Sequence, residues 1–119
     1  VWAFSTAGVS APLLYKAVAV ESVKNIAALT PQALAKTVWA FAKAGVPAPA
    51  LFRCVSLRAS TTTSAFDSQA LATTAWAFAT AEFRAPMLFE AVAAEALGKI
   101  ETFNAQELAN TAWAFSKAC

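Results

Sequence analysis

The chain has few of the side chains that most enzymes use for chemistry. Its 119 residues include no histidine, so the commonest general base and the commonest metal ligand are both absent. The only two cysteines, Cys54 and Cys119, are too few and too far apart for a zinc-binding pattern. The three glycines form no phosphate-binding loop. We therefore expect a protein that is not an enzyme and needs no cofactor.

Charged residues are also scarce, at 13% of the chain against 59% hydrophobic residues. A transmembrane helix needs about 20 mostly apolar residues in a row. Charged side chains such as Lys36 and Lys43 interrupt the apolar runs before that length, so we expect no membrane span. The net charge of +2 is too small to indicate nucleic-acid binding by itself. It is unevenly distributed, however, because the basic residues gather in the first half of the chain and the acidic ones in the second.

What the chain has in abundance is internal repetition. Trp2, Trp39, Trp76 and Trp113 recur at an unbroken step of 37 residues. A fixed period of this size is typical of a repeat array, in which one supersecondary unit stacks on its copies. We divide the chain into a partial repeat (1–29), repeats 30–66 and 67–103, and a partial repeat (104–119). Neither end shows a polar cap, so we expect part of a longer array or a subunit docked into a larger assembly.

Each repeat carries the signals of two helices. Thr30 is suited to cap the first helix, and Gly45 is suited to end it in a left-handed turn. Gly8 is expected to end the corresponding helix of the first copy in the same way. A second helix opens at Pro49. Asp67 and Asn104 are the equivalent caps, and Glu107 completes a capping box with Asn104. In repeat 30–66 the segment Ser60–Ser64 is expected to end the second helix early, because serine and threonine compete for backbone hydrogen bonds. The predicted fold class is all-α, an α-solenoid of helix–turn–helix repeats with a 37-residue period.

The first helix of each repeat is apolar on nearly all sides. Leu34, Val38 and Phe41 form a stripe with Trp39 beside it, so we expect the helix to be packed between its neighbours and the tryptophans to fill the core between layers. On this interpretation the substitution Trp76→Ala leaves a cavity and lowers the free energy of unfolding by roughly 3–5 kcal/mol. In the second helices, Leu14, Val18 and Ile26, with Leu88, Val92 and Ile100, are expected to face inward. Thr37, Thr74 and Thr111 are expected to hydrogen-bond to their own helix or to a neighbouring one.

Polar positions that differ between otherwise similar repeats are candidates for binding. In repeat arrays that read RNA, each unit offers two or three side chains to one base. Lys36, Thr73 and Asn110 occupy one such position, with a second polar residue seven places later and a glutamine one turn earlier. A polar position of this kind can equally be only the solvated side of a helix. The candidate surface comprises Gln32, Lys36, Lys43, Gln69, Thr73, Thr80, Gln106, Asn110 and Lys117, together with Arg53 and Arg58 on the second helix.

The motif Leu-Ala-x-Thr-x-Trp-Ala-Phe, at residues 34–41, 71–78 and 108–115, resembles the first helix of the octotricopeptide-repeat proteins. The 37-residue period is closer still to the related heptatricopeptide repeats. The resemblance implies an organellar protein that binds RNA and supports its maturation, stability, translation or ribosome assembly. We expect the organelle to be a plastid, with a mitochondrion as the alternative. The alternative is a protein-binding scaffold in a large organellar complex, such as a ribosome or a photosynthetic assembly. The two differ in salt dependence, since binding through phosphates weakens steeply as ionic strength rises.

Overall fold

The structure, a computed structural model, describes residues 11–118, and within that range it is helical and contains no strand. The all-α prediction is therefore confirmed. The helices are α2 (Ala11–Lys24), α3 (Pro31–Ala44), α4 (Pro49–Ser60), α5 (Ser68–Thr80), α6 (Pro86–Lys99) and α7 (Ala105–Ala118). Short 3₁₀ turns follow α2, α4 and α6, at Ile26–Ala28 (η1), Thr63–Ala65 (η2) and Ile100–Thr102 (η3).

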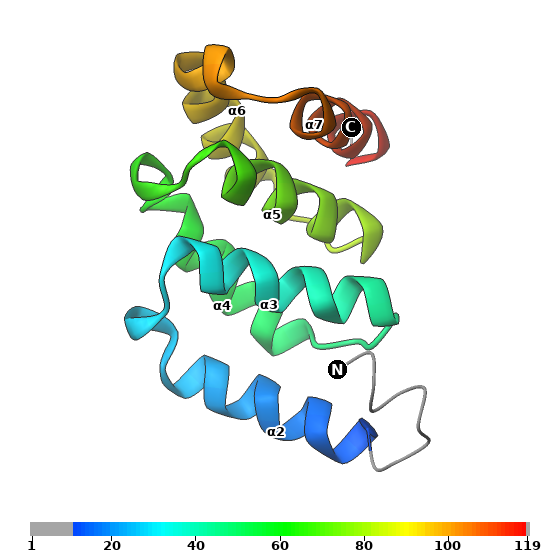
Figure 1. The fold of residues 1–119 in the computed structure, drawn as a ribbon. Coiled ribbons are helices and arrows are strands. Elements are labelled where there is room, and N and C mark those ends of the chain that lie inside the picture. The colour runs from blue at the N-terminus through cyan, green and yellow to red at the C-terminus, as the bar shows by residue number, and fades with distance from the viewer. Residues whose placement is uncertain (1–10, 119) are drawn as a thin grey trace.

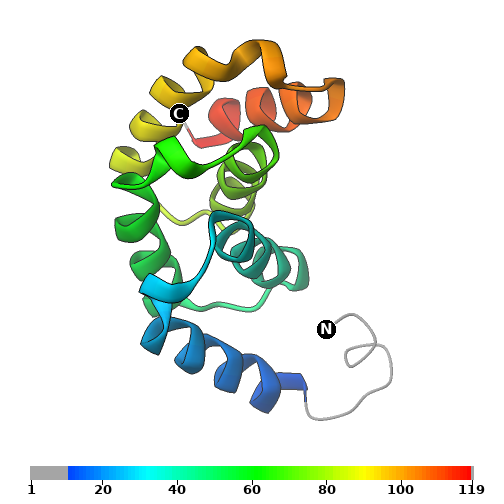
Figure 2. The same cartoon turned by 60° about the vertical axis from the view of Figure 1, so that its left-hand side comes forward.

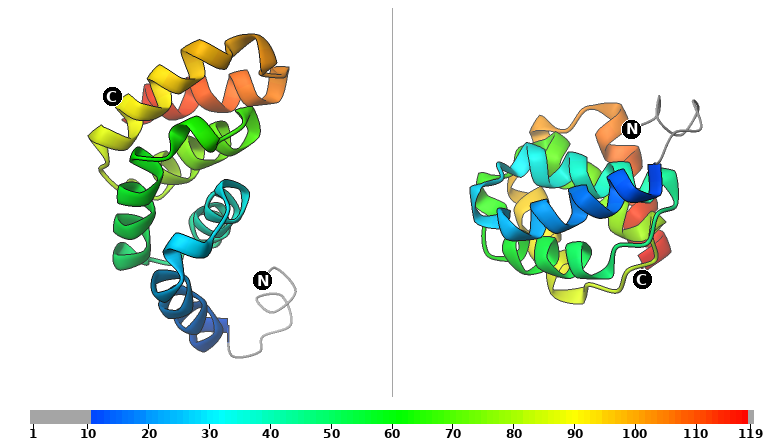
Figure 3. Two further views of the ribbon diagram at one scale, coloured as in Figure 1. Left: turned by 90° about the vertical axis from the view of Figure 1, so that its left-hand side faces the viewer. Right: turned by 90° about the horizontal axis from the view of Figure 1, so that it is seen from below.

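The helices form two layers. In one layer α3 packs on α5 and α5 on α7, and in the other α2 packs on α4 and α4 on α6 (Figure 1). Figure 2 shows the second layer as the outer side of a curved arrangement, with α3, α5 and α7 on the inner side. The left-hand view of Figure 3 shows the same curvature, and the described part measures 42 × 27 × 23 Å. Helix α5 thus lies between two neighbours of its own layer.

The inner helices begin at the caps that the sequence predicts. Thr30 Oγ1 accepts a hydrogen bond from the backbone N–H of Ala33 at 3.1 Å, and Asp67 Oδ1 accepts one from Ala70 at 2.8 Å. At α7 the bonds are reciprocal. Asn104 Oδ1 accepts from the Glu107 N–H at 2.8 Å, and Glu107 Oε1 accepts from the Asn104 N–H at 2.9 Å. The predicted capping box is confirmed, and each cap supplies an acceptor to an N–H group that the helix itself leaves free.

Asp67→Ala should lower the free energy of unfolding by about 1 kcal/mol, because the Ala70 N–H loses its acceptor at the start of α5. Chemical denaturation of the variant checks this value. Gln69→Ala is the matched control, since Gln69 is exposed two residues further on and caps nothing. Equal stability of the two variants would contradict the capping role.

Two inner helices end in the same hydrogen-bonded turn with different residues in it. After α3, Gly45 has φ +71°, and the Val46 N–H donates to the Phe41 carbonyl at 3.0 Å. After α5, Glu82 takes the left-handed position with φ +57°, and the Phe83 N–H donates to Phe78 at 3.1 Å. The glycine stop expected at Gly45 is confirmed, whereas the one expected at Gly8 lies outside the described residues.

The core joins each outer helix to the inner helix that follows it in the chain, α2 to α3, α4 to α5 and α6 to α7. Leu34, Val38 and Phe41 are buried as predicted. Aromatic side chains pack edge to face between the layers in three equivalent places. The ring centroids are 5.2 Å apart for Tyr15 and Phe41, 5.0 Å for Phe52 and Phe78, and 5.1 Å for Phe89 and Phe115.

The inward side of the outer helices is only partly as expected. Leu88 and Val92 are buried, but Val18 is 37% exposed and Ile100 is 45% exposed. Val18 lies on α2, the first helix of the described residues, which packs on α4. Ile100 lies in η3, where the chain has left α6 to turn towards α7. Residues 37 positions apart in the sequence therefore differ in burial, since Val92 is buried and Val18 is not.

Helix α4 ends early, as its composition predicts. It has 12 residues, whereas α2 and α6 have 14 each. Ser60 Oγ donates to the Ser56 carbonyl at 2.6 Å, and Thr62 Oγ1 donates to the Arg58 carbonyl at 2.8 Å. These side chains donate hydrogen bonds to carbonyl groups in the last turn of the helix, which allows the chain to leave the helix there.

Candidate functional site

The polar positions selected from the sequence share one side of the inner helices with the tryptophans. Within each helix the four positions are separated by four, three and four residues, a spacing that places them on one side of an α-helix. We call this surface the tryptophan face. It consists of Gln32, Lys36, Trp39 and Lys43 on α3, Gln69, Thr73, Trp76 and Thr80 on α5, and Gln106, Asn110, Trp113 and Lys117 on α7.

The prediction that the tryptophans fill the core is wrong for two of the three described. Trp39 is 38% exposed and Trp113 is 45% exposed, while Trp76 is half-buried against the core. Trp2 lies outside the described residues. Small residues take the place expected for the indoles, since α5 buries Ala70, Ala72, Ala75, Ala77 and Ala79. Alanines at these positions allow the inner helices to approach closely, and the indoles lie at the edge of the contact between them. We accordingly expect Trp76→Ala to lower the free energy of unfolding by less than the 3–5 kcal/mol predicted for a fully buried side chain.

Lysine side chains lie over two of the exposed indoles. Lys43 Nζ is 5.2 Å from the ring centroid of Trp39, and Lys117 Nζ is 5.9 Å from that of Trp113. Both distances fall within the range of cation–π attraction. In the middle repeat the equivalent of the lysine is Thr80, and Trp76 instead has Trp113 as its neighbour, with centroids 6.3 Å apart and planes inclined by 33°. The face therefore carries one pair of indoles, Trp76 and Trp113, and a third indole, Trp39, with a lysine over Trp39 and another over Trp113.

The remaining polar side chains of the face differ in how far they are engaged. Gln106 Nε2 donates to Asn110 Oδ1 at 3.0 Å, so these two amides form a pair. Gln32 Nε2 reaches Asp67 Oδ2 at 3.4 Å across the gap between α3 and α5. Lys36 is exposed, whereas Thr73 is half-buried. The position that varies between repeats is thus accessible in all three, most fully at Lys36.

The face carries three cations, and two carboxylates lie at its border, with Asp67 Oδ2 3.4 Å from Gln32 and Glu82 Oε2 3.4 Å from Lys117. Its twelve side chains include three lysines and no carboxylate. Lys117 is also 3.4 Å from Glu82, an exposed ion pair whose contribution to stability is small. The two cations of α3 thus make the α3 end of the face its more basic end.

Arg53 and Arg58 do not join this surface. Both lie on α4 in the outer layer. Arg53 is exposed, while Arg58 Nη2 donates to the Ala27 carbonyl at 3.3 Å and so links α4 to η1 of the preceding repeat. Lys99 makes an equivalent link from α6, with Nζ 2.7 Å from the Phe66 carbonyl oxygen and 3.0 Å from that of Ser64. The sequence did not indicate that these cations connect successive repeats.

Threonines in the inner helices do not all find the partners expected of them. Thr37 Oγ1 donates to the Ala33 carbonyl at 2.6 Å, as predicted. The hydroxyls of Thr74, Thr80 and Thr111 are buried without a hydrogen-bond partner. Thr74 is the most enclosed of them, at 0% exposure.

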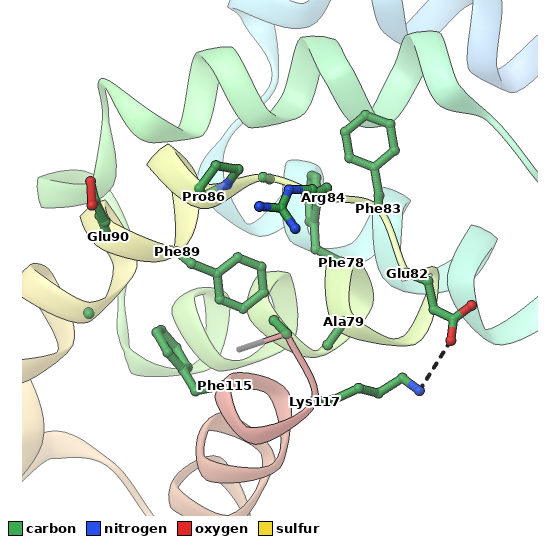
Figure 4. A pocket seen from close by; sticks show the side chains of 13 residues that line it. Phe78, Ala79, Glu82, Phe83, Arg84, Pro86, Phe89, Glu90, Phe115 and Lys117 are labelled. Atoms are coloured by element: carbon green, nitrogen blue, oxygen red, sulfur yellow. Dashed lines mark hydrogen bonds and ion pairs between the residues drawn. The ribbon is translucent and has the colours of Figure 1, made fainter.

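A groove of about 680 Å³ opens between the end of α5, the start of α6 and the end of α7. Figure 4 shows its aromatic walls, with Phe89 and Phe115 side by side and Phe78 and Phe83 further along, and the Lys117–Glu82 pair at its rim. Arg84 and Glu90 are the other charged side chains that line it. A second groove, of about 540 Å³, lies beside Tyr15, Phe41 and Val46 at the other end of the stack. In the middle repeat Phe83 packs on Phe52 and Phe78 at the equivalent place. The grooves therefore belong to the junctions between repeats.

Residues 11–118 contain neither a group of side chains suited to a metal ion nor a helix that could span a membrane. No three acidic or cysteine side chains gather there in a way that could hold a metal ion. None of the helices in that part of the chain combines the length and the apolar character needed to cross a bilayer.

Comparison with known proteins gives one match. Residues 1–118 match the model of a family described as RNA-editing substrate-binding complex 6 protein. No curated protein and no solved structure matches the chain. Since the family match covers nearly the whole sequence, the chain belongs to the RNA-editing substrate-binding complex 6 protein family.

Proposed function

We propose that this chain is a non-catalytic subunit of an RNA-processing complex and that it binds RNA through the tryptophan face. The observation that carries the proposal is the composition of that face: three indoles and three lysines, with no carboxylate among its twelve side chains. Lysines bind phosphate groups, while amide and hydroxyl side chains hydrogen-bond to base edges. The description of the family, which names an RNA-editing substrate-binding complex, agrees with a subunit of this kind.

The repeat architecture forms part of the same proposal. The stacking of α3, α5 and α7 on one another supports an α-solenoid with a 37-residue period, in which each unit contacts its neighbours. We retain the division at residues 30, 67 and 104 and the resemblance to octotricopeptide and heptatricopeptide repeats as proposals. An organellar location is consistent with a family of RNA-editing proteins, but that family gives no support to a plastid over a mitochondrion.

Replacing Lys36, Lys43 and Lys117 together by Ala should weaken RNA binding and reduce its salt dependence. Each phosphate contact on a single strand contributes about 0.7 to the slope of log K against log salt, so the loss of three should reduce that slope by about 2. Fluorescence anisotropy with a labelled single-stranded RNA, at several salt concentrations, measures both quantities.

The matched control is the variant with Lys16, Lys24 and Arg53 replaced by Ala. It removes the same charge from exposed positions of the outer layer. If both variants lose affinity equally, the charge acts at long range and the tryptophan face is not the site. If the unaltered chain binds no RNA even at low salt, the proposed function is wrong.

A protein-binding role is the second candidate, and exposed apolar side chains of the outer layer favour it. Leu57 on α4 is 66% exposed, and Met87 and Leu97 on α6 are 73% and 75% exposed. Exposed apolar side chains can contribute to a contact with another protein where they form one continuous patch. Partners that co-purify after nuclease treatment, and that are lost when these three residues are changed to Ser, would support this role.

A further inference from the structure

We infer that Trp39 and Trp113 are stacking platforms for unpaired bases, so that the ligand of the tryptophan face is single-stranded. This inference rests on the proposed function and adds to it which side chains hold the bases. Aromatic side chains bind single strands by stacking on the flat surfaces of successive bases, and they do so with little regard to sequence. In a duplex those surfaces are covered by the neighbouring base pairs, and only the base edges are accessible.

Accessibility is the first argument. Trp39 and Trp113 expose 38% and 45% of their surface on α3 and α7, the first and last inner helices of the described residues. Leu108, on the same helix as Trp113, is 44% exposed too, but Trp39 has the buried Val38 and Ala42 beside it. An indole held on a rigid helix beside a packed core loses little conformational entropy on binding. Both rings are therefore partly accessible and held in place, with a lysine ammonium group over each.

The position of the cations is the second argument. Lys43 and Lys117 each stand four residues after an indole and hold their ammonium groups 5.2 and 5.9 Å from the ring centroids. A base that stacks on the indole brings its phosphate into the neighbourhood of that ammonium group. Ring and cation together thus match the two parts of a nucleotide, the flat base and the anionic phosphate.

Trp76 differs from the other two indoles, and this difference makes the inference specific. It is half-buried, it has Trp113 6.3 Å away, and its repeat carries Thr80 in place of the lysine. We therefore expect Trp76 to support Trp113 rather than to hold a base of its own. The loss of affinity should be larger for Trp39 and Trp113 than for a variant at Trp76.

The test compares Trp39→Leu, Trp113→Leu and Trp76→Leu in the full chain, with a 12-nucleotide single-stranded RNA and the corresponding duplex as probes. Base–aromatic stacking contributes about 1–3 kcal/mol per base, and 1.4 kcal/mol is tenfold in affinity. Each of the first two variants should therefore weaken single-strand binding about tenfold, with less effect at Trp76. Binding by the unaltered chain should quench its tryptophan fluorescence, and the duplex should bind more weakly than the single strand.

Two controls keep the outcome interpretable. Leu57→Ala removes an exposed apolar side chain from the outer layer and should leave affinity unchanged. Trp39→Phe keeps a ring and should restore part of the affinity that Trp39→Leu loses. If the single strand binds with its salt dependence intact in Trp39→Leu and Trp113→Leu, the stacking inference is wrong and the proposed function stands. Equal affinity for the duplex would overturn the inference as well. If no RNA binds the unaltered chain, both fail, and a protein ligand for this face becomes the alternative.

Discussion

Phe78→Ala should lower the free energy of unfolding by about 3–5 kcal/mol, the largest effect that we expect from any single substitution in this chain. Phe78 is 0% exposed on α5, the helix with neighbours on both sides. Its ring packs against Phe52, with centroids 5.0 Å apart, and against Phe83 at 5.8 Å. Truncation leaves a cavity where the two layers and two successive repeats meet, and the rigid helices around it cannot close it.

Urea denaturation of Phe78→Ala and Trp76→Ala, two positions of one helix that differ by two residues, measures this effect. Phe78 is fully buried and Trp76 is half-buried. The free energy of unfolding should therefore fall clearly more for Phe78→Ala, although phenylalanine has the smaller ring. A larger loss at Trp76 would show that the indole is the main packing element after all. In that case the sequence-based expectation of a tryptophan core would be right and the exposed face would be wrong.

Thr74→Val should raise the free energy of unfolding by about 1–3 kcal/mol. The Thr74 hydroxyl is fully buried and has no hydrogen-bond partner, and an enclosed hydroxyl without a partner costs about that much. Valine has nearly the same shape and removes the polar atom. Thermal and chemical denaturation of the variant should both show the gain.

Thr37→Val is the control for this substitution, because Thr37 occupies the same position one repeat earlier. Its hydroxyl donates to the Ala33 carbonyl, so its replacement removes a hydrogen bond and should bring no gain in stability. If both threonines respond alike, the hydroxyl of Thr74 has a partner in solution, and the explanation given for the gain is wrong.

The sequence predicted the local structure well because the signals for it are local. A cap acts over three residues, so Thr30, Asp67 and Asn104 could be identified from the printed sequence alone. Gly45 ends α3 for a reason that belongs to glycine itself. The early end of α4 followed in the same way from its run of serines and threonines.

What the sequence could not decide was the side on which Trp39 lies. It directly follows the buried Val38, and one step along a helix turns the side chain by about 100°, which is enough to move it from the core to the surface. Periodicity places the apolar residues on a broad stripe but does not reveal how closely the neighbouring helix approaches. The buried alanines of α5 allow a close approach, and the indoles lie at the edge of that contact. The candidate polar residues and the tryptophans were therefore assigned to different surfaces, although they share one.

The arginines show the same limit. Arg53 and Arg58 were grouped with the lysines by charge, yet a helix of the other layer carries them. The sequence shows which residues are charged, but which groups those residues contact depends on how the helices pack on one another. The hydrogen bond from Arg58 to the Ala27 carbonyl spans two repeats and leaves no mark in the sequence of either.

The turns after α3 and α5 show that one backbone conformation can be kept with two very different residues in it. Gly45 makes its left-handed turn without steric cost, whereas a non-glycine residue such as Glu82 pays about 1–3 kcal/mol for the same conformation. An exposed ion pair with Lys117 returns only a fraction of that. The turn nevertheless keeps its hydrogen bonds and the apolar residue that follows, Val46 in one copy and Phe83 in the other. The same turn is thus retained at two places in the chain although only one of them has the glycine that favours it, so backbone form and residue identity are independent there.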